Sequence, residues 1–142
     1  MNKPDLQMTR ALADEMVEHC RAWYPKEGCG MLAMKDGEIV KVFKMTNTEN
    51  SPVRYALHGK EQLAAENTIA ANGWELGGIF HSHTHTEAVP SPTDVRKAIE
   101  PVPYVIVSFA DDPPSIRAFW INKADPQDED GEVEEIPVVV IG

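Results

Sequence analysis

Three histidines occupy alternate positions in the stretch IFHSHTHTEAVPSPTD, residues 79–94, and a serine and an aspartate follow near its end. Imidazole and carboxylate groups are typical ligands of zinc in hydrolytic enzymes. Side chains on a strand alternate between faces, so His81 and His83 should project from one face, about 7 Å apart along the backbone. Two imidazoles at this spacing can converge on one zinc ion, with bonds of about 2.0–2.1 Å. The stretch therefore predicts a metal site at the end of a strand.

The third ligand is expected from another element. Asp94 falls one turn into a short helix predicted after the loop, and with two neutral imidazoles it would leave zinc with one net positive charge. Three protein ligands leave a fourth position open, which distinguishes a catalytic zinc site from a structural one. Zinc lowers the pKa of a bound water from about 15.7 toward about 7, so hydroxide becomes available at neutral pH. His85 would share the ligand face only if the strand reached it, and the loop-like TEAVPSP that follows argues against this.

A hydrolytic site also needs a base that takes a proton from water and passes it to the leaving amine. Glu27, Glu75 and Glu87 are the candidate carboxylates. Glu75 is expected at the far end of the histidine strand, and Glu87 lies in a loop that solvent can reach. Glu27 directly precedes GCGML, whose two glycines permit close backbone approach, so its carboxylate could be partly buried beside the metal. We therefore rank Glu27 first.

The spacing alone leaves simpler interpretations open. A His-x-His-x-His tract can be an adventitious metal binder or the polar end of a strand, and Ser-Pro-Thr-Asp is a good helix start without any chemistry. Cys20 and Cys29 form no Cys-x-x-Cys pattern, so we interpret both as buried small hydrophobic residues. The His-x-Glu and Pro-Cys-x-x-Cys signature of zinc nucleobase deaminases is absent from the sequence.

Hydrophobic periodicity predicts the elements that position these residues. A helix is predicted over 9–24, capped by Thr9, and a β-hairpin over 28–45, with its tight turn at Asp36-Gly37. The other predicted elements are a short strand over 53–58, a helix over 59–73, a strand over 75–83, a helix over 91–100, and strands over 103–110, 115–122 and 134–141, the last at an edge or bulge because of Pro137. Frequent hairpins among alternating helices and strands predict an α/β fold with a mixed, mostly antiparallel sheet flanked by helices.

Length and composition limit the class of protein. The 142 residues fit one domain, 1–142, which would bury roughly 68% of its unfolded surface. The formal charge of −10 argues against nucleic-acid binding, which needs a basic surface. Residues 125–135 hold seven acids and no Lys or Arg, and we interpret them as a solvated loop and turn. We find neither a signal peptide nor the roughly 18 consecutive apolar residues of a membrane span, so a cytoplasmic protein is expected.

The spacing of five residues resembles the JAMM (MPN-plus) metallopeptidase motif. His81-x-His83 is followed by Ser91 and Asp94 in order, and Glu27 lies upstream. More narrowly, the chain is similar to the actinobacterial Mec branch, peptidases that remove a C-terminal cysteine from a ubiquitin-like sulfur carrier protein in cysteine biosynthesis. The segments that carry this similarity are PKEGCGML, MTNTENSP, GKEQL, HSHTHTEAVPSPTDVRKA and PYVIVSF.

The resemblance implies a single-domain MPN/JAMM fold with one zinc ion per chain. It implies His81, His83 and Asp94 as zinc ligands and Glu27 as general base and acid. Ser91 is implied as the hydrogen-bonding group that positions the water or stabilises the oxyanion. The implied partner is a ubiquitin-like sulfur carrier protein with a Gly-Gly C-terminus, and the implied reaction is hydrolysis of the amide that joins this end to a terminal cysteine.

Other functions compatible with the motif are processing of another sulfur carrier in secondary metabolism and removal of an isopeptide-linked ubiquitin-like modifier. The deubiquitinating form of the motif has proline directly after its second histidine, where this chain has Thr84, which disfavours that activity. A non-catalytic MPN scaffold is disfavoured because all five positions are present. Arg54 is a candidate partner for the carboxylate of the leaving cysteine, and its alternative is a solvated strand arginine. The motif predicts no oligomeric state.

Overall fold

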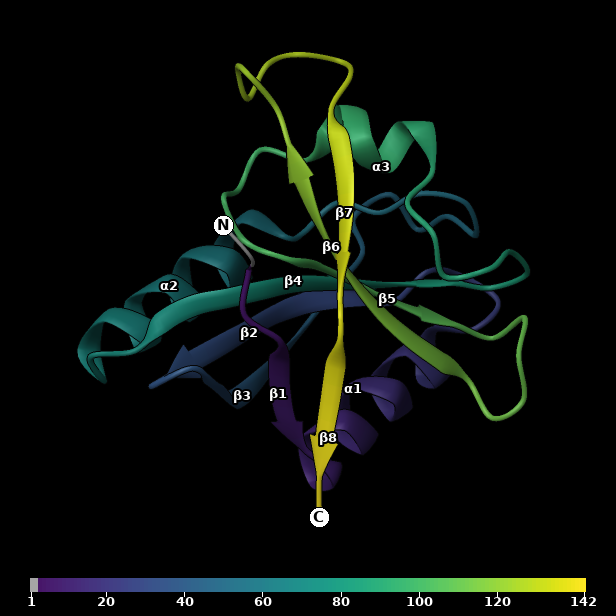
Figure 1. The fold of residues 1–142 in the computed structure, drawn as a ribbon. Coiled ribbons are helices and arrows are strands. Elements are labelled where there is room, and N and C mark those ends of the chain that lie inside the picture. Colours follow the sequence, from purple (N-terminus) through teal and green to yellow (C-terminus); the bar gives the residue numbers. More distant parts are fainter. Residues whose placement is uncertain (1–2) are drawn as a thin grey trace.

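Eight strands form one mixed sheet in the computed structural model, which describes residues 3–142 (Figure 1). Their order across the sheet is β7-β6-β5-β4-β2-β3-β1-β8. The strands are β1 (Leu6–Thr9), β2 (Cys29–Lys35), β3 (Glu38–Met45), β4 (Glu75–His83), β5 (Tyr104–Ser108), β6 (Ser115–Asn122), β7 (Glu132–Ile136) and β8 (Val138–Ile141). The helices described are α1 (Arg10–Trp23), α2 (Gly59–Ala71) and α3 (Pro92–Lys97). Four of the seven neighbouring strand pairs are antiparallel, so the predicted α/β fold class is confirmed.

Strand β4 lies at the centre of the sheet and carries the two histidines at its end. It pairs antiparallel with β2 and parallel with β5, and its last seven residues are buried. The predicted alternation of side chains is confirmed: Ile79 packs in one hydrophobic cluster and Phe80 in the cluster on the other face. His81 therefore projects on the face of Ile79, whereas Ser82 accepts a hydrogen bond from the Gly28 amide at 2.8 Å.

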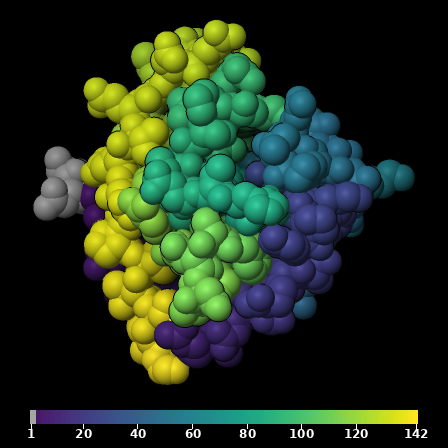
Figure 2. Space-filling model, turned by 90° about the vertical axis from the view of Figure 1, so that its right-hand side faces the viewer, coloured from purple at the N-terminus to yellow at the C-terminus, as the bar shows by residue number. Residues whose placement is uncertain are grey.

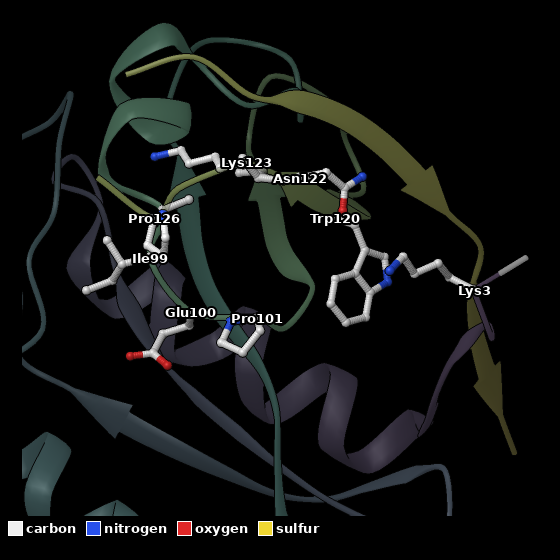
Figure 3. A pocket seen from close by; sticks show the side chains of 10 residues that line it. Lys3, Ile99, Glu100, Pro101, Trp120, Asn122, Lys123 and Pro126 are labelled. Atoms are coloured by element: carbon white, nitrogen blue, oxygen red, sulfur yellow. The ribbon is translucent and has the colours of Figure 1, made fainter. Parts of the chain in front are cut away.

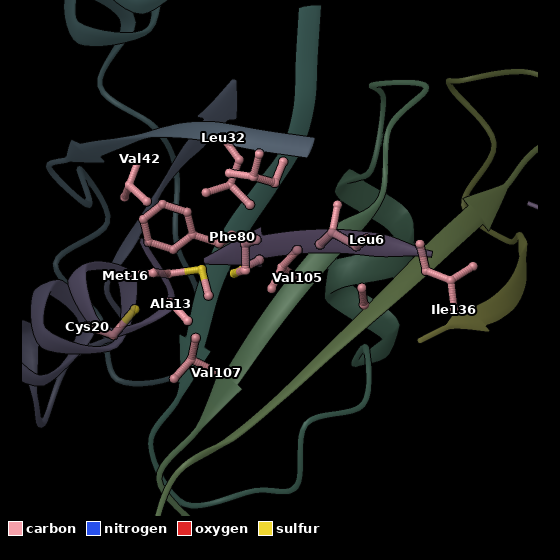
Figure 4. Close-up of a cluster of buried hydrophobic side chains, with 13 residues drawn as sticks. Leu6, Ala13, Met16, Cys20, Leu32, Val42, Phe80, Val105, Val107 and Ile136 are labelled. Atoms are coloured by element: carbon pink, nitrogen blue, oxygen red, sulfur yellow. The ribbon is translucent and has the colours of Figure 1, made fainter. Parts of the chain in front are cut away.

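The two faces of the sheet are covered by different helices. Helix α1 packs against β1, β3 and β8, and its Met16 and Cys20 enter a core with Leu32, Phe80 and Val105 (Figure 4). Helix α2 packs against β2, β3 and β4 and contributes its own apolar residues to the second cluster. Burying each large apolar side chain contributes about 1.5–3 kcal/mol, so these layers hold β4 in place between them.

Gly30 allows β2 to lie against the core at a point where no larger residue fits. A β-carbon there would collide with the Phe43 carbonyl oxygen and with the ring of Phe80. The predicted hairpin at the other end of β2 is confirmed, because Asp36 and Gly37 have φ values of 51° and 83°, as a tight type I′ turn requires.

Strands β7 and β8 connect the two edges of the sheet. The predicted strand over 134–141 is divided at Pro137: β7 pairs with β6, and β8 pairs with β1 at the opposite edge. The Pro137 carbonyl accepts a hydrogen bond from the Leu6 amide at 2.9 Å. Figure 1 shows β7 and β8 running on as one nearly straight segment. Because Pro137 alone separates these two edge strands, the sheet curves so that its opposite edges meet at this residue.

Three sequence predictions need correction. Residues 53–58 form a loop with one isolated bridge, between Asn47 and Leu57, because hydrogen bonds to the Asn47 side chain replace strand pairing. The helix predicted over 91–100 ends at Lys97, where the amides of Ile99 and Glu100 donate to the Tyr104 hydroxyl instead. The acidic segment 125–135 is a loop only in part, since its last residues belong to β7.

The two cysteines are free and buried, as predicted. Among the described residues, no helix is both long enough and apolar enough to cross a membrane.

Candidate active site

The three predicted ligand atoms meet at the end of β4. The His81 Nε2 atom lies 3.3 Å from His83 Nε2 and 3.2 Å from Asp94 Oδ2, and His83 Nε2 lies 3.1 Å from Asp94 Oδ2. Bonds of about 2.0–2.1 Å at tetrahedral angles separate ligand atoms by about 3.3 Å, so this triangle has the size of one face of a zinc coordination tetrahedron. All three side chains are nearly inaccessible to solvent. The donor set and its spacing fit zinc.

Local sequence places Asp94 in this triangle. Ser91 caps α3: its hydroxyl accepts from the Asp94 amide at 3.1 Å, and Asp94 Oδ2 accepts from the Ser91 amide at 2.9 Å. Pro92 occupies the first helical position, which its fixed φ favours. This capping box confirms the predicted helix start and directs one carboxylate oxygen toward both imidazoles.

Backbone carbonyls and hydroxyls fix the orientation of the His83 ring. Its Nδ1 lies 2.8 Å from the Glu87 carbonyl oxygen and 3.1 Å from Thr86 Oγ1. The Thr86 carbonyl in turn accepts from the Ser108 hydroxyl at 2.6 Å. Because a carbonyl can only accept, Nδ1 carries the proton of the neutral ring and Nε2 presents its lone pair to the triangle, as a metal ligand must.

The ring of His81 is held by stacking. Tyr55 lies parallel to it, with 4.4 Å between the ring centroids and 17° between the planes. Within the described part of the chain, His81 Nδ1 is buried and has no hydrogen-bond partner. Burial lowers the pKa of His81, which favours the neutral imidazole that binds a metal.

The charges at the triangle are strongly coupled. Burial acts to raise the pKa of the Asp94 carboxyl, but hydrogen bonds with His81 and His83 outweigh it and hold that pKa well below its usual range. Burial acts to lower the pKa of His83, yet its hydrogen bonds with Asp94 and the Glu87 carbonyl raise it overall. Without metal, the buried Asp94 carboxylate therefore favours a proton on His83.

Glu27 lies beside this triangle in a dry environment. It is only 4% exposed, and its Oε1 atom is buried without a hydrogen-bond partner among the described residues. Burial, assisted by the negative charge of Asp94, raises its pKa to about 8, although the charge of His83 acts in the opposite direction. The rival carboxylates are less suited: Glu75 begins β4 at the far end, and Glu87 is exposed and offers its backbone carbonyl to His83.

Sequence reasoning missed Asn47, which fixes the backbone of Glu27. This buried side chain donates from Nδ2 to the carbonyls of Glu27 and Arg54, both at 3.0 Å. Its Oδ1 accepts from the amides of Glu49 at 3.0 Å and Ala56 at 3.1 Å. All four hydrogen-bonding positions of the amide are thus occupied, and the loop that carries Tyr55 is tied to the strand start that carries Glu27. An asparagine in the segment MTNTENSP was the available signal, but the sequence alone gave it no partner.

Two cavities adjoin the site. One of about 460 Å³ contains three of the five predicted site residues and is lined by Glu27, Pro52, Val53, His83, Thr84, His85, Thr86 and Ser91. The other, of about 350 Å³, begins at Tyr55 and is lined by Tyr55, Ala56, Leu57, Gln62, Ile79, Lys97, Ile99, Glu100 and Tyr104. Figure 2 faces the end of β4: the teal segment that follows this strand lies in the middle of the surface, beside the blue segment that contains the loop of Asn47.

Two further predicted candidates lie outside the triangle. His85 is exposed and contacts Tyr24, whose hydroxyl is 3.4 Å from its Nε2. The side chain of Arg54 is exposed, and the residue lines neither cavity. A separate pocket near Trp120 and Pro101 contains none of the five site residues; there Lys3 Nζ lies 4.3 Å from the centre of the indole ring (Figure 3).

Comparison with known proteins agrees with this arrangement. Residues 9–122 match the family described as prokaryotic homologs of the JAB domain. The chain is 40% identical over 134 residues to the CysO-cysteine peptidase of Mycobacterium tuberculosis, covering 92% of this chain and 87% of that protein. It is 36% identical over 117 residues to a probable TtuB-protein conjugate cleaving protease of Thermus thermophilus, covering 82% of this chain and 76% of the other.

A solved structure of a protein from Desulfitobacterium hafniense is also similar, with a TM-score of 0.82 and 33% identity over 95% of this chain and 92% of that one. The match to the family extends from the cap of α1 to the end of β6 and includes every residue of the site. The chain belongs to the prokaryotic JAB-domain family, within the JAMM/MPN metallopeptidases whose motif its sequence resembles.

Proposed function

We propose that this protein is a zinc metallopeptidase that cleaves the amide between the C-terminal Gly-Gly of a ubiquitin-like sulfur carrier protein and a terminal cysteine, and so releases cysteine. The observation that carries the proposal is the position of Glu27, a buried, unpaired carboxylate in the same cavity as His83 and Ser91. The 40% identity to a CysO-cysteine peptidase supports the substrate class.

His81, His83 and Asp94 would hold one zinc ion per chain. When bound, zinc polarises a carbonyl and lowers the pKa of water, a contribution worth several kcal/mol in the transition state. The Glu87 carbonyl keeps the proton of His83 on Nδ1, and Tyr55 fixes the plane of His81. The chain thus presents two neutral imidazoles and one carboxylate with their orientations set in advance.

Glu27 would move the proton. Its pKa of about 8 in the metal-free protein means that the carboxyl can hold a proton near neutral pH, and the positive charge of bound metal would bring that pKa down toward neutrality. A base with a pKa near the working pH can both take a proton from water and return it to the departing amine. We therefore assign both transfers to this one side chain.

Ser91 would stabilise the oxyanion. Its Oγ already accepts a hydrogen bond from the Asp94 amide, so its own proton is free to be donated into the cavity that it lines. Removal of one such donor costs about 10²–10³ in rate in a studied protease. On the acyl side, we place the Gly-Gly tail over the cavity beside Tyr55, because only glycine lets an extended backbone pass so close to packed aromatic rings.

Three further assignments accompany the proposal. Every described strand belongs to the same sheet, which supports a single domain over residues 1–142. The free thiols of Cys20 and Cys29 support a reducing compartment such as the cytoplasm. The net charge of −10 supports a protein partner and disfavours nucleic acid.

The test is mass spectrometry of a sulfur carrier that bears a C-terminal cysteine, incubated with zinc-loaded protein. We expect loss of one cysteine residue, blocked by a chelator and restored by zinc. The similarity to a conjugate-cleaving protease favours a second candidate, hydrolysis of a carrier joined to a protein lysine. The same carrier in isopeptide linkage separates the two: faster cleavage of the isopeptide would replace our first assignment by the second.

A further inference from the structure

We propose that the peptide group between Met45 and Thr46, at the end of β3, sets the position of Glu27, and that His19 and Glu61, which hold this peptide group, are positioning residues for the proton transfers. We call the two side chains and the peptide group between them the peptide clamp. This inference rests on the proposed hydrolysis and adds two residues on which its rate depends.

The peptide clamp acts from both faces of the sheet. His19 on α1 donates from Nε2 to the Met45 carbonyl at 3.1 Å. Glu61 on α2 accepts from the Thr46 amide at 2.6 Å and, with its other oxygen, from the Thr46 hydroxyl at 2.9 Å. The two helices cover opposite faces, and the carbonyl and amide of a planar trans peptide point in opposite directions. The peptide group therefore cannot rotate without breaking hydrogen bonds on both sides.

His19 also reaches the start of β2. Its Nε2 atom lies 3.0 Å from the Cys29 carbonyl oxygen. Because carbonyls only accept, Nε2 carries a hydrogen and shares it between the carbonyls of Cys29 and Met45. These two residues are partners at the last pair of the β2–β3 ladder. The ring stands edge-on to the buried Phe80 ring, with 6.1 Å between the centroids and 82° between the planes. His19 thus closes the ladder at the point where its backbone pairing ends.

Beyond this pair, the two chain segments are joined at Glu27. Glu27 comes two residues before Cys29, and Asn47 comes two residues after Met45. The Asn47 side chain donates to the Glu27 carbonyl at 3.0 Å. Since Thr46 alone separates Met45 from Asn47, a rotation of the Met45–Thr46 peptide group would displace the residue that holds the Glu27 backbone.

The carboxylate of Glu27 depends on that backbone for its position. The Glu27 amide donates to the Ser51 carbonyl at 2.9 Å. The Gly28 amide donates to the Ser82 hydroxyl at 2.8 Å, and the Gly28 carbonyl accepts from the Ser82 amide at 3.0 Å. Among the described residues, Glu27 Oε1 itself has no hydrogen-bond partner that could correct a displaced backbone. A misplacement of about 1 Å can cost about 10²-fold in rate, so the peptide clamp should affect catalysis.

Variants of the two side chains test this inference in the zinc-loaded protein, with a carrier that bears a C-terminal cysteine. His19→Met removes the donor, and His19→Gln restores one at a similar reach. Glu61→Ala removes both acceptors, and Glu61→Gln keeps an oxygen for the Thr46 amide. We expect kcat to fall about 10–100-fold in His19→Met and Glu61→Ala and to recover in the glutamine variants, while KM and zinc content stay within about twofold.

Matched controls lie on the same two helices. Asp14→Asn on α1 and Glu66→Gln on α2 change exposed side chains and should leave kcat unchanged. Should His19→Met not fold, Glu61→Ala decides alone, because Glu61 belongs to none of the buried hydrophobic clusters. An unchanged kcat in folded Glu61→Ala would overturn the inference.

A double-mutant cycle shows whether the peptide clamp acts through Glu27. Glu27→Asp shortens the side chain by one methylene, so its carboxylate is displaced whatever the clamp does. In that background we expect His19→Met and Glu61→Ala to lower kcat by less than about threefold, because their effects are not additive with that of Glu27→Asp. The same factor in both backgrounds, or a loss of zinc, would overturn the assignment, since the clamp would then act through the metal ligands or the fold as a whole.

Failure of the proposed function has a different signature. A zinc-loaded wild-type protein that cleaves neither the cysteine carrier nor the isopeptide carrier would overturn the proposed hydrolysis. The peptide clamp is then tested by amide hydrogen exchange, followed by NMR. In His19→Met and Glu61→Ala, the amides of Glu27 and of Ala56, which donates to Asn47, should exchange at least about tenfold faster, with smaller changes in β5. Equal acceleration in β5 would overturn a positioning role, because the two side chains would then only stabilise the whole fold.

Discussion

The side-chain amide of Asn47 donates to the backbone carbonyl of Glu27 over 3.0 Å, although the two residues are separated by 20 positions in the chain. The same amide group also holds the carbonyl of Arg54, next to the tyrosine that stacks on His81. One buried side chain thus holds both the backbone of the carboxylate to which we assign the proton transfers and the loop whose tyrosine stacks on a proposed metal ligand.

Replacing Asn47 should affect stability and catalysis together. Asn47→Asp keeps the acceptor oxygens but leaves the carbonyls of Glu27 and Arg54 without a donor, and Asn47→Ala removes all four hydrogen bonds. We expect each buried group left unpaired to cost about 1–3 kcal/mol in the free energy of unfolding. Asn72→Ala is the matched control, because Asn72 also donates to a carbonyl, that of Thr68, but at an exposed position.

The pH profile separates a positioning role from a purely structural one. If Asn47 positions Glu27, the acid limb of kcat against pH should shift in Asn47→Asp at temperatures where the variant is fully folded. Reduced stability with an unchanged profile would limit Asn47 to holding the fold.

Replacing Glu27 by glutamine should abolish hydrolysis and leave the metal bound. The amide has nearly the same shape but can neither take nor return the proton, so we expect kcat to fall by about 10²–10⁴. Zinc content, measured by atomic emission, should equal that of the wild type, because Glu27 supplies none of the three converging ligand atoms of His81, His83 and Asp94. Glu75→Gln, at the far end of β4, serves as control; substantial activity in Glu27→Gln would mean that another group moves the proton.

Metal-free protein should lose stability as the pH rises. The pKa of Glu27 is raised from 4.5 to about 8 by burial, so the folded state binds a proton that the unfolded state has already released across this interval. The stabilisation is complete below about pH 4.5 and is lost as the pH rises through about 8. Thermal unfolding between pH 5 and 9 in the presence of a chelator should show this fall, on the order of a few kcal/mol. In Glu27→Gln the fall should be much smaller; identical slopes in both proteins would refute the raised pKa.

A methyl group at Gly30 should destabilise the central sheet. Gly30→Ala places a β-carbon against the Phe43 carbonyl and the Phe80 ring, and overpacking of this kind costs about 1–3 kcal/mol. Gly59→Ala is the control, because no atom lies within 4 Å of its added carbon at the start of α2. Urea unfolding of both variants measures the difference, and equal midpoints would show that β2 and β3 move apart at little cost.

Much of the site could be predicted because its geometry is local. Alternation on one strand places His81 and His83 on the same face, and a capping box spanning four residues brings in Asp94. Glu27 could be placed near the start of a strand because it directly precedes GCGML, and β2 does begin at Cys29.

The contacts that were missed depend on the path of a loop. VRYALH has the β-branched and aromatic residues of a strand, yet Tyr55 stacks on His81 from a loop that Asn47 holds. No local sequence pattern predicts either partner, because the Asn47–Glu27 hydrogen bond and the Tyr55–His81 stacking both join positions more than 19 residues apart. Strand β1 escaped prediction for a similar reason: its four residues pair mainly with β8, at the other end of the chain.

That pairing determines when the sheet can be completed during synthesis. Strand β1 is synthesised before every other described strand, but its full partner, β8, is synthesised after all of them, and β6 waits for β7 in the same segment. Until residues 132–141 have emerged, the two outer strands keep unpaired backbone groups, and the core around α1 lacks Ile136, Val138 and Val140. Contacts between distant positions in the sequence slow folding. The sheet therefore stays incomplete, with β1 and β6 as open edges, until the segment that carries β7 and β8 has been synthesised.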